Sequence, residues 1–126
     1  MSIPAVARDE ASEEFFDGTA AGVYLIRRCE PHGHASKPQA LQCSFCASED
    51  LRWEPSSGEA RLVSWAVLPP PASSVVAVAE LKEGPWMWAA LLCDDPAVLQ
   101  EGMALRVAFE RPPGSEAIPV LVPAGA

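Results

Sequence analysis

The chain has 126 residues, which is enough for one ordinary domain or for a small module joined to a half-size one. Because 49% of the residues are hydrophobic, the chain can bury a core. Its net charge of −8 disfavours general binding to nucleic acid or to an anionic membrane surface. No apolar run approaches the roughly 20 residues of a membrane span, and the first residues are too acidic for a signal peptide, so we expect a cytoplasmic protein.

Charge and residue pattern divide the chain into three segments, residues 1–22, 23–56 and 57–126. The first is acidic and predicts a short helix at about 9–21, because acidic side chains in the first turn suit the positive end of a helix dipole. This helix has no long apolar stripe and cannot be stable alone. It is either a lid over the module that follows or a segment that docks on another protein through Phe15 and Phe16.

The second segment begins with a strand-like run at 22–27 and then becomes polar. Its main motif is a pair of short spacings, Cys29-x2-His32 and, ten residues later, Cys43-x2-Cys46. Two such pairs can form knuckles that close a tetrahedron around zinc, and a site with four protein ligands would be structural because no position stays open for water or substrate. His34 competes with His32 for the fourth position. The alternative without metal is three free cysteines beside two solvent-exposed histidines.

The third segment predicts an all-β unit, because short apolar or alternating runs are separated by turns rich in proline and glycine. The five predicted strands are 61–68, 75–81, 86–93, 105–110 and 117–122. Leu105, Val107 and Phe109 alternate with other residues, which predicts a strand with one wet face. A helical turn is expected at 96–101, with Asp95 as its N-cap and Gly102 as its end. Five strands with a short helix between the third and the fourth follow the order of an OB-fold barrel.

One predicted strand is apolar on both faces. Trp86 and Trp88 alternate with Met87, so the two tryptophans share a face. Aromatic side chains on an OB barrel can stack nucleobases, but we interpret these two as barrel core. Because the opposite face is equally apolar, one face of this strand is expected to meet a partner. Cys93 is expected to be a buried strand residue, and both histidines lie in the metal segment, so no nucleophile–base pair is predicted.

The order of these features resembles that of a known family. The motifs that carry the resemblance are Phe15-Phe16-Asp17-Gly18, the cysteine–histidine pairs, Ser57-Gly58, Val63-Ser64-Trp65-Ala66-Val67, the run 76–84, Asp95-Pro96, Glu101-Gly102-Met103 and Val107-x-Phe109-Glu110. Over nearly its whole length the chain is similar to zinc-ribbon plus OB-fold proteins associated with acyl-CoA metabolism, catalogued as domain of unknown function thirty-five. It departs from them in two places: such proteins usually carry cysteine where His32 stands, and the loop 69–74 is shorter than is typical.

The resemblance implies a mainly β fold made of a short N-terminal helix, a rubredoxin-like zinc ribbon and a five-stranded OB-fold barrel. It also implies a non-catalytic accessory subunit of a thiolase-like acyl-CoA enzyme, similar to the small zinc-finger subunit of the benzylsuccinate-pathway thiolase. Partners of this type include the lipid-transfer-protein-type aldolases of steroid side-chain breakdown. Structural Zn²⁺ would be the cofactor, and a CoA thioester would be bound jointly with the partner. The implied partner contacts are Phe15, Phe16 and Tyr24, and the implied contacts with CoA or the partner are Trp86, Trp88, Arg27 and Arg28.

Two other functions fit less of the sequence. A zinc-ribbon and OB-fold module that binds single-stranded nucleic acid needs a basic groove, which disagrees with the acidic composition. A stand-alone hydrolase of acyl-CoA thioesters needs a base near Cys93 or near a serine. We therefore expect a hetero-oligomer in which the partner carries the catalytic residues and supplies most contacts to the CoA phosphates.

Overall fold

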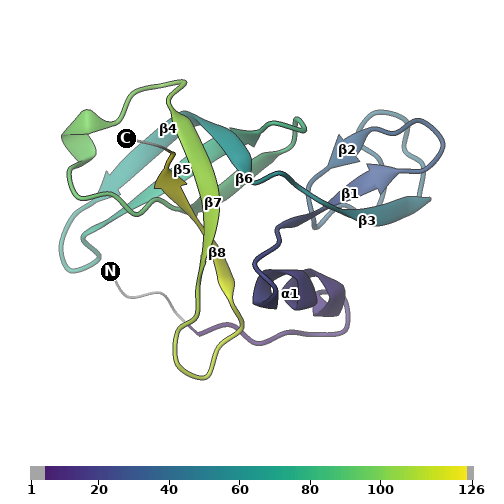
Figure 1. Ribbon diagram of the computed structural model, residues 1–126, viewed down its shortest axis with the longest axis horizontal. Coiled ribbons are helices and arrows are strands. Elements are labelled where there is room, and N and C mark those ends of the chain that lie inside the picture. The colour runs from purple at the N-terminus through teal and green to yellow at the C-terminus, as the bar shows by residue number, and fades with distance from the viewer. Residues whose placement is uncertain (1–4, 125–126) are drawn as a thin grey trace.

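The computed structural model describes residues 5–124, which form one short α-helix and two antiparallel sheets (Figure 1). The smaller sheet has the strand order β2-β1-β3 and the larger has the order β6-β5-β4-β7-β8. The elements are α1 Glu13–Ala20, β1 Leu25–Cys29, β2 Ala35–Ser36, β3 Leu51–Pro55, β4 Glu59–Leu68, β5 Ser74–Leu81, β6 Trp86–Ala90, the 3-10 helix η1 Pro96–Val98, β7 Ala104–Glu110 and β8 Ile118–Pro123. This architecture confirms the predicted mainly β class. The ends of the predicted segments 1–22 and 57–126, at 1–4 and 125–126, lie outside the described residues.

The five-stranded sheet curls until its two outer strands come together (Figure 1). Strand β4 pairs with β5 over nearly its whole length but with β7 only near its start, and a register shift between Leu62 and Ser64 interrupts its pairing with β5. Just after β6, Leu91 pairs in parallel with Leu121 of β8, and the Leu92 N–H donates to the Leu121 carbonyl over 2.9 Å. Along the chain, η1 lies between β6 and β7, the third and fourth of the five barrel strands. This is the order of the predicted OB-fold barrel.

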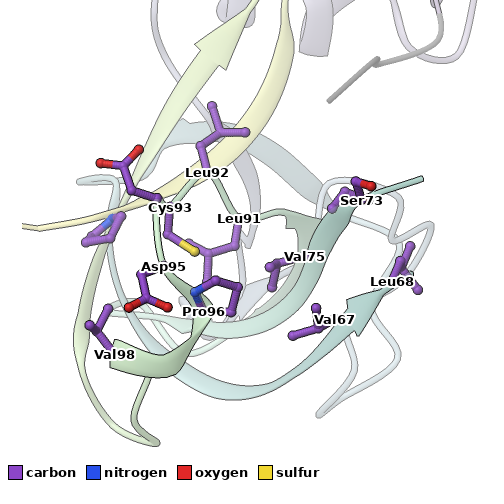
Figure 2. Close-up of a pocket in the computed structure, with 13 residues that line it drawn as sticks. Val67, Leu68, Ser73, Val75, Leu91, Leu92, Cys93, Asp95, Pro96 and Val98 are labelled. Carbon is purple, nitrogen blue, oxygen red and sulfur yellow. The ribbon is translucent and has the colours of Figure 1, made fainter. Parts of the chain in front are cut away.

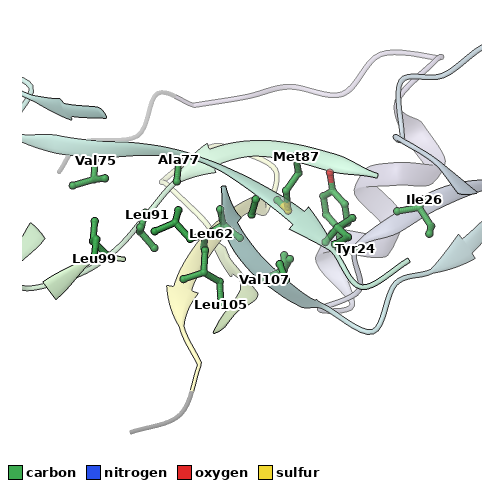
Figure 3. Packing of buried hydrophobic residues seen from close by; sticks show 14 residues of the cluster. Tyr24, Ile26, Leu62, Val75, Ala77, Met87, Leu91, Leu99, Leu105 and Val107 are labelled. Atoms are coloured by element: carbon green, nitrogen blue, oxygen red, sulfur yellow. The ribbon is translucent and has the colours of Figure 1, made fainter. Parts of the chain in front are cut away.

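One cluster of buried apolar side chains joins the barrel to the ribbon, meaning the three-stranded sheet and its loops (Figure 3). Leu62, Leu105 and Leu121 lie inside the barrel, and each is at most 1% exposed. Tyr24 and Ile26, at the start of the ribbon, belong to the same cluster. The two sheets therefore share a core, and burying these side chains stabilises both of them together.

The helix α1 is shorter than the predicted 9–21, because polar side chains hold the preceding residues in a turn. The Ser12 N–H donates to Asp9 Oδ1 over 2.9 Å, and the Ser12 hydroxyl lies 2.7 Å from the same oxygen. Such local bonds compete with the helical backbone pattern. The helix ends through Gly22, whose φ is +77°, and the N–H groups of Gly22 and Val23 bond back to the last turn in a Schellman motif. For this reason β1 begins three residues later than predicted.

Three features of the strands differ from the prediction. Strands β2 and β3 were not expected, because they are short and form only by pairing with β1. Strand β6 ends at Ala90 rather than at 93, since Leu91 turns away to pair with Leu121. Cys93 consequently follows the strand and is half-buried, so the prediction of a buried strand residue was wrong. All other barrel strand ends fall within two residues of the predicted positions.

Two local predictions in the barrel are confirmed. Asp95 caps η1, because its carboxylate accepts a hydrogen bond from the Ala97 N–H over 3.0 Å, although η1 ends at Val98 and not at Gly102 as predicted. Along β7, Leu105 and Val107 are buried while Arg106 is exposed, so this strand has one wet face. In the part of the chain that the structure describes, no helix is long and apolar enough to cross a membrane.

The segment before α1 is tied to the loop between β7 and β8. Arg8 donates to both carboxylate oxygens of Glu116, over 2.9 Å from Nε and 3.0 Å from Nη2, and its Nη1 lies 2.6 Å from Asp17 Oδ1. The Val6 N–H donates to Ser115 Oγ over 2.8 Å, and the Glu116 N–H donates to the Val6 carbonyl over 2.9 Å. The hydrogen bonds from Arg8 hold the pKa of the Glu116 carboxyl below its usual range.

We expect Arg8→Ala to lower the Tm at neutral pH by about 2–5 °C, because it removes a bidentate ion pair that joins distant parts of the chain. Since the folded state lowers the pKa of Glu116, this contribution is present above the unfolded carboxyl pKa of about 4.3 and is lost as the pH falls through the folded value. Thermal unfolding of both proteins from about pH 7 to about pH 3 checks this, and the difference in Tm should shrink below about pH 4. Arg106→Ala, an exposed site on β7, is the control. An Arg8→Ala protein as stable as wild type at neutral pH would contradict the prediction.

Candidate metal centre and docking surface

Two tight turns carry the predicted metal ligands. In the first, the Gly33 N–H donates to the Cys29 carbonyl over 2.7 Å, and the Cys29 N–H donates to the His34 carbonyl over 2.8 Å. Gly33 has a φ of +72°, which a side chain at this position would strain. In the second turn, the Ala47 N–H donates to the Cys43 carbonyl over 2.9 Å. Backbone bonds thus set both turns, and the turns bring their side-chain donors together.

The donor atoms lie at the separations that a tetrahedral metal ion requires. Cys29 Sγ is 3.5 Å from Cys46 Sγ, and Cys43 Sγ is 3.6 Å from His34 Nδ1. The donor atoms of Cys29, His32, His34 and Cys46 all lie within 4.8 Å of one another. Bonds of about 2.3 Å from zinc to sulfur and about 2.0 Å to nitrogen would separate two sulfurs by about 3.8 Å and a sulfur from a nitrogen by about 3.6 Å. This group can therefore hold a metal ion. It contains three of the four predicted ligands together with His34, and the fourth, Cys43, lies beside it through its contact with His34.

The cysteines of this cluster affect one another's ionisation. Burial acts to raise the pKa of Cys43, but the N–H groups of Cys46 and Phe45 point to its sulfur and lower the pKa to about 6. For Cys46 the Ser48 N–H acts to lower the pKa, whereas burial and the sulfurs of Cys29 and Cys43 raise it, and the net direction is upward. One thiolate therefore forms readily, while ionising its neighbours requires a compensating cation.

The aromatic residues predicted to bind a partner lie on the flank of the ribbon. The Phe15 ring packs edge-on against Tyr24, with centroids 5.6 Å apart, and against Phe16 at 5.3 Å. Both phenylalanines are half-buried. Tyr24 is only 7% exposed, and burial raises the pKa of its hydroxyl to about 12. Tyr24 thus supports Phe15 from inside the core, and we do not carry it forward as a direct partner contact.

The two arginines predicted to meet CoA or a partner are engaged within the ribbon. The guanidinium of Arg27 stacks 4.3 Å above the Trp53 ring. Arg28 donates from Nε to the Glu54 carboxylate over 2.7 Å, and the Glu54 pKa is lowered by this pairing. Because both cations already have partners in the same sheet, neither is a free anchor for a phosphate.

The interpretation of Trp86 and Trp88 as barrel core was wrong. Trp86 is 54% exposed and Trp88 is 75% exposed, while Met87 between them is 4% exposed and lies in the core. The strand does alternate as predicted, but the side chain that points inward is that of Met87, which is narrower than an indole. The interior is already filled by the other strands and by Tyr24, so it cannot take two indoles (Figure 3).

The exposed tryptophans line a groove of about 810 Å³ between the barrel and the ribbon. Phe45, from the second metal turn, lies in the same groove and is 72% exposed. The Glu83 carboxylate, also in this groove, accepts hydrogen bonds from Ser56 Oγ and the Ser57 N–H, each over 2.8 Å. These bonds connect the ribbon–barrel junction to the β5–β6 turn. Burial acts to raise the Glu83 pKa, but these donors outweigh it and the net direction is downward.

A second exposed apolar region was not predicted. The outer half of β4 presents Trp65, Val67 and Leu68, which are 36%, 56% and 37% exposed. A groove of about 820 Å³ runs from Val67 and Leu68 to Cys93 and Val98 (Figure 2). The signal in the sequence was the unbroken run from Trp65 to Leu68, because a strand buried on one face only would alternate with polar residues.

Similarity to known proteins covers both the barrel and the whole fold. The family model for the C-terminal OB-fold domain of ChsH2 matches residues 53–110. A DUF35 domain-containing scaffold protein of Pyrococcus furiosus is 28% identical over 87 residues, an alignment that spans 64% of this chain and 63% of that protein, less than two thirds of its length.

Two solved structures share the fold. One, described as an Ltp2-ChsH2(DUF35) aldolase, is similar with a TM-score of 0.79 and 26% identity, over 98% of this chain and 100% of that chain. A DUF35-family protein of unknown function from Sulfolobus solfataricus has a TM-score of 0.63 and 12% identity, over 90% and 85% of the two chains, and shares the fold alone. The predicted resemblance to DUF35/ChsH2 OB-fold proteins is therefore confirmed by the family model, the scaffold relative and this structure.

Proposed function

We propose that this chain is a non-catalytic accessory subunit of a thiolase-like acyl-CoA enzyme that carries out thiolysis or a retro-aldol or Claisen cleavage. The observation that carries the proposal is the similarity over 98% of the chain, at a TM-score of 0.79, to a structure described as an Ltp2-ChsH2 aldolase. The word scaffold in the name of the Pyrococcus relative supports the same role. The subunit would stabilise its partner and help to form the acyl-CoA site.

The surroundings of Cys93 support a non-catalytic role. Burial raises the pKa of the Cys93 thiol, and the neighbouring carboxylates of Asp94 and Asp95 raise it further, so the thiol stays protonated near neutral pH. Both histidines of the chain belong to the metal cluster. A nucleophile and a base would therefore have to come from the partner.

The metal cluster supports structural zinc. Three thiolates with one imidazole are ligands typical of zinc, and four protein ligands leave no position for water or substrate. The ion would supply the positive charge that the cysteine sulfurs lack, and it would hold the two turns together. Its binding energy would be folding energy for the ribbon.

The exposed apolar side chains support a partner that covers them. Trp86, Trp88 and Phe45 project into one groove, and a monomeric soluble domain rarely exposes so many large apolar side chains. Phe15 and Phe16 remain proposed contacts through their exposed edges, next to Leu41, which is 86% exposed. A CoA thioester would be bound jointly, with most phosphate contacts from the partner because Arg27 and Arg28 are already paired.

A second candidate function is binding of single-stranded nucleic acid, because exposed tryptophans on an OB barrel can stack bases. The groove that holds them contains only two cationic side chains, Arg28 and Lys37, and Arg28 is paired with Glu54. Protein docking is therefore the better fit. A salt-dependent shift with an oligonucleotide would favour this second function instead.

We expect Cys43→Ser to lose zinc and to give insoluble or partner-free protein, because residues 24–54 would lose the ion that closes the ribbon. Elemental analysis of the purified protein and size-exclusion chromatography check this. Cys93→Ser is the matched control, since Cys93 lies outside the cluster and should keep one zinc per chain. A Cys43→Ser protein that is soluble and fully assembled would rule out the structural role.

For the partner, we expect turnover only when the chain is co-expressed with a thiolase-like protein from the same genome, and none from the chain alone.

Trp88→Ser should weaken assembly by about 30-fold, the cost of removing an aromatic anchor from an interface. Lys82→Ser, at an exposed lysine of the β5–β6 turn, is the control and should change affinity little. Dissociation constants by calorimetry and acyl-CoA cleavage assays measure both effects. Turnover by the isolated chain would overturn the proposal.

A further inference from the structure

The outer half of β4 has a neighbouring strand on one side only. Its pairing with β5 continues to the end of the strand, whereas its pairing with β7 stops at Arg61. The last backbone bonds on the β7 side belong to Leu62, whose N–H donates to the Met103 carbonyl over 3.0 Å and whose carbonyl accepts the Gly102 N–H over 2.7 Å. In the described part of the chain, no strand pairs with this edge along 63–68. The edge therefore presents a row of unpaired N–H and C=O groups.

This edge lacks the devices that usually keep a second strand away. Edge strands are commonly protected by a charge, a proline or a bulge within the exposed stretch. The register shift of β4 lies between Leu62 and Ser64, and after it the pairing with β5 is regular to the end of the strand. From residue 62 to residue 79 no side chain is charged. The ribbon strand β3, in contrast, carries Arg52 and Glu54.

The side chains along this edge lie outside the barrel core. Residues 64–68 are all exposed. Trp65 stands opposite the buried Ala77 of β5. Val67 stands opposite the buried Val75, and these two valines line the groove shown in Figure 2. Because directly opposite residues share a face of a sheet, Trp65 and Val67 project on the inner side, where a strand added at this edge would cover them.

Two copies of this edge are complementary to each other. If two β4 strands run antiparallel about a two-fold axis at Trp65, then Ser64 of one copy lies opposite Ala66 of the other, and Val63 lies opposite Val67. The two indoles meet at the axis, and aromatic pairs across strands are stabilising. The net charge of −8 makes two copies repel elsewhere, but the uncharged β4–β5 hairpin brings no like charges together.

We propose that the free edge of β4 is a homodimer interface, at which the β4 strands of two copies pair antiparallel about Trp65 and join two barrels into one continuous sheet. A two-fold dimer is the commonest closed arrangement of identical chains, and it uses the same surface of both copies. The β4–β5 turn lies at the end of the barrel away from the ribbon (Figure 1). The interface is thus separate from the groove that holds Trp86 and Trp88, and it does not depend on the proposed function.

Sedimentation equilibrium of the purified full chain tests the interface. We expect the wild type to show a monomer–dimer equilibrium that depends on protein concentration. Trp65→Lys should raise the dissociation constant of the dimer at least about 30-fold, because it removes an aromatic anchor and places like charges opposite each other. The matched variant Trp88→Lys, at the exposed indole of β6, should leave the dissociation constant unchanged. A monomer at every concentration, or a dimer that Trp65→Lys does not weaken, would overturn the proposal.

A charge swap tests the register and shows whether the variants still fold. Trp65→Glu alone should dimerise as poorly as Trp65→Lys, and mixing the two should restore a dimer with one chain of each, because the two side chains meet at the axis. Two variants that fail to associate when mixed, although the wild type dimerises, would contradict this register.

Hydrogen exchange on the wild type gives a result that needs no variant. Amides along 63–67 should become more protected as the protein concentration rises, because they gain partners in the dimer, whereas amides of β6 should not change. Protection of β6 instead would place self-association at the other groove and overturn the proposal. A wild-type chain that stays monomeric, but whose assembly with the thiolase-like partner is abolished by Trp65→Lys, would assign the edge to that partner and would equally overturn it.

Discussion

The ribbon cannot be held by its own hydrophobic contacts, and this constraint determines how the rest of the molecule is built. Strand β2 has two residues, and no residue of β3 is buried. Tyr24 and Ile26 anchor one end of the ribbon in the barrel core. The other end, which carries the turns at 29–34 and 43–47, is held by hydrogen bonds, by an ion pair between Arg52 and Glu30, and by the cluster of sulfur and imidazole donors. A segment this small usually needs a metal or a disulfide, and all four cysteines of the chain are free thiols.

The barrel has the opposite problem, because it has more apolar side chains than its interior can hold. Met87 fills the inside of β6, and the two neighbouring indoles are left on the outside. The outer half of β4 also extends past its pairing with β7 and exposes Val67 and Leu68. The net charge of −8 favours solubility of the free chain despite these surfaces. An exposed apolar surface on an acidic domain fits a subunit whose stable state is a complex.

The sequence was sufficient to predict the strands of the barrel but not those of the ribbon, and the difference has a physical reason. Turns rich in proline and glycine separate the barrel strands. These turn residues predict the strand ends within two residues, except at Cys93. The ribbon strands β2 and β3 exist only through pairing with β1 across many residues, and no local pattern reports such pairing. Periodicity placed Trp86 and Trp88 on one face correctly, but it could not say which face was inside. That depends on how much volume the other strands leave.

Sequence spacing likewise could not predict where the cysteine and histidine side chains lie in space. Their positions link the metal centre to the docking surface. Spacing gives the order of the candidate ligands, whereas the backbone bonds of the turns at 29–34 and 43–47 bring the ligands close together in space. His34 and Phe45 pack together at the cluster, and both line the groove that also holds Trp86 and Trp88. One wall of the groove is therefore set by the donors of the metal cluster and the other by the barrel. Because the first wall lacks a core of its own, an ion bound at the cluster would determine whether the groove has the shape that a partner can bind.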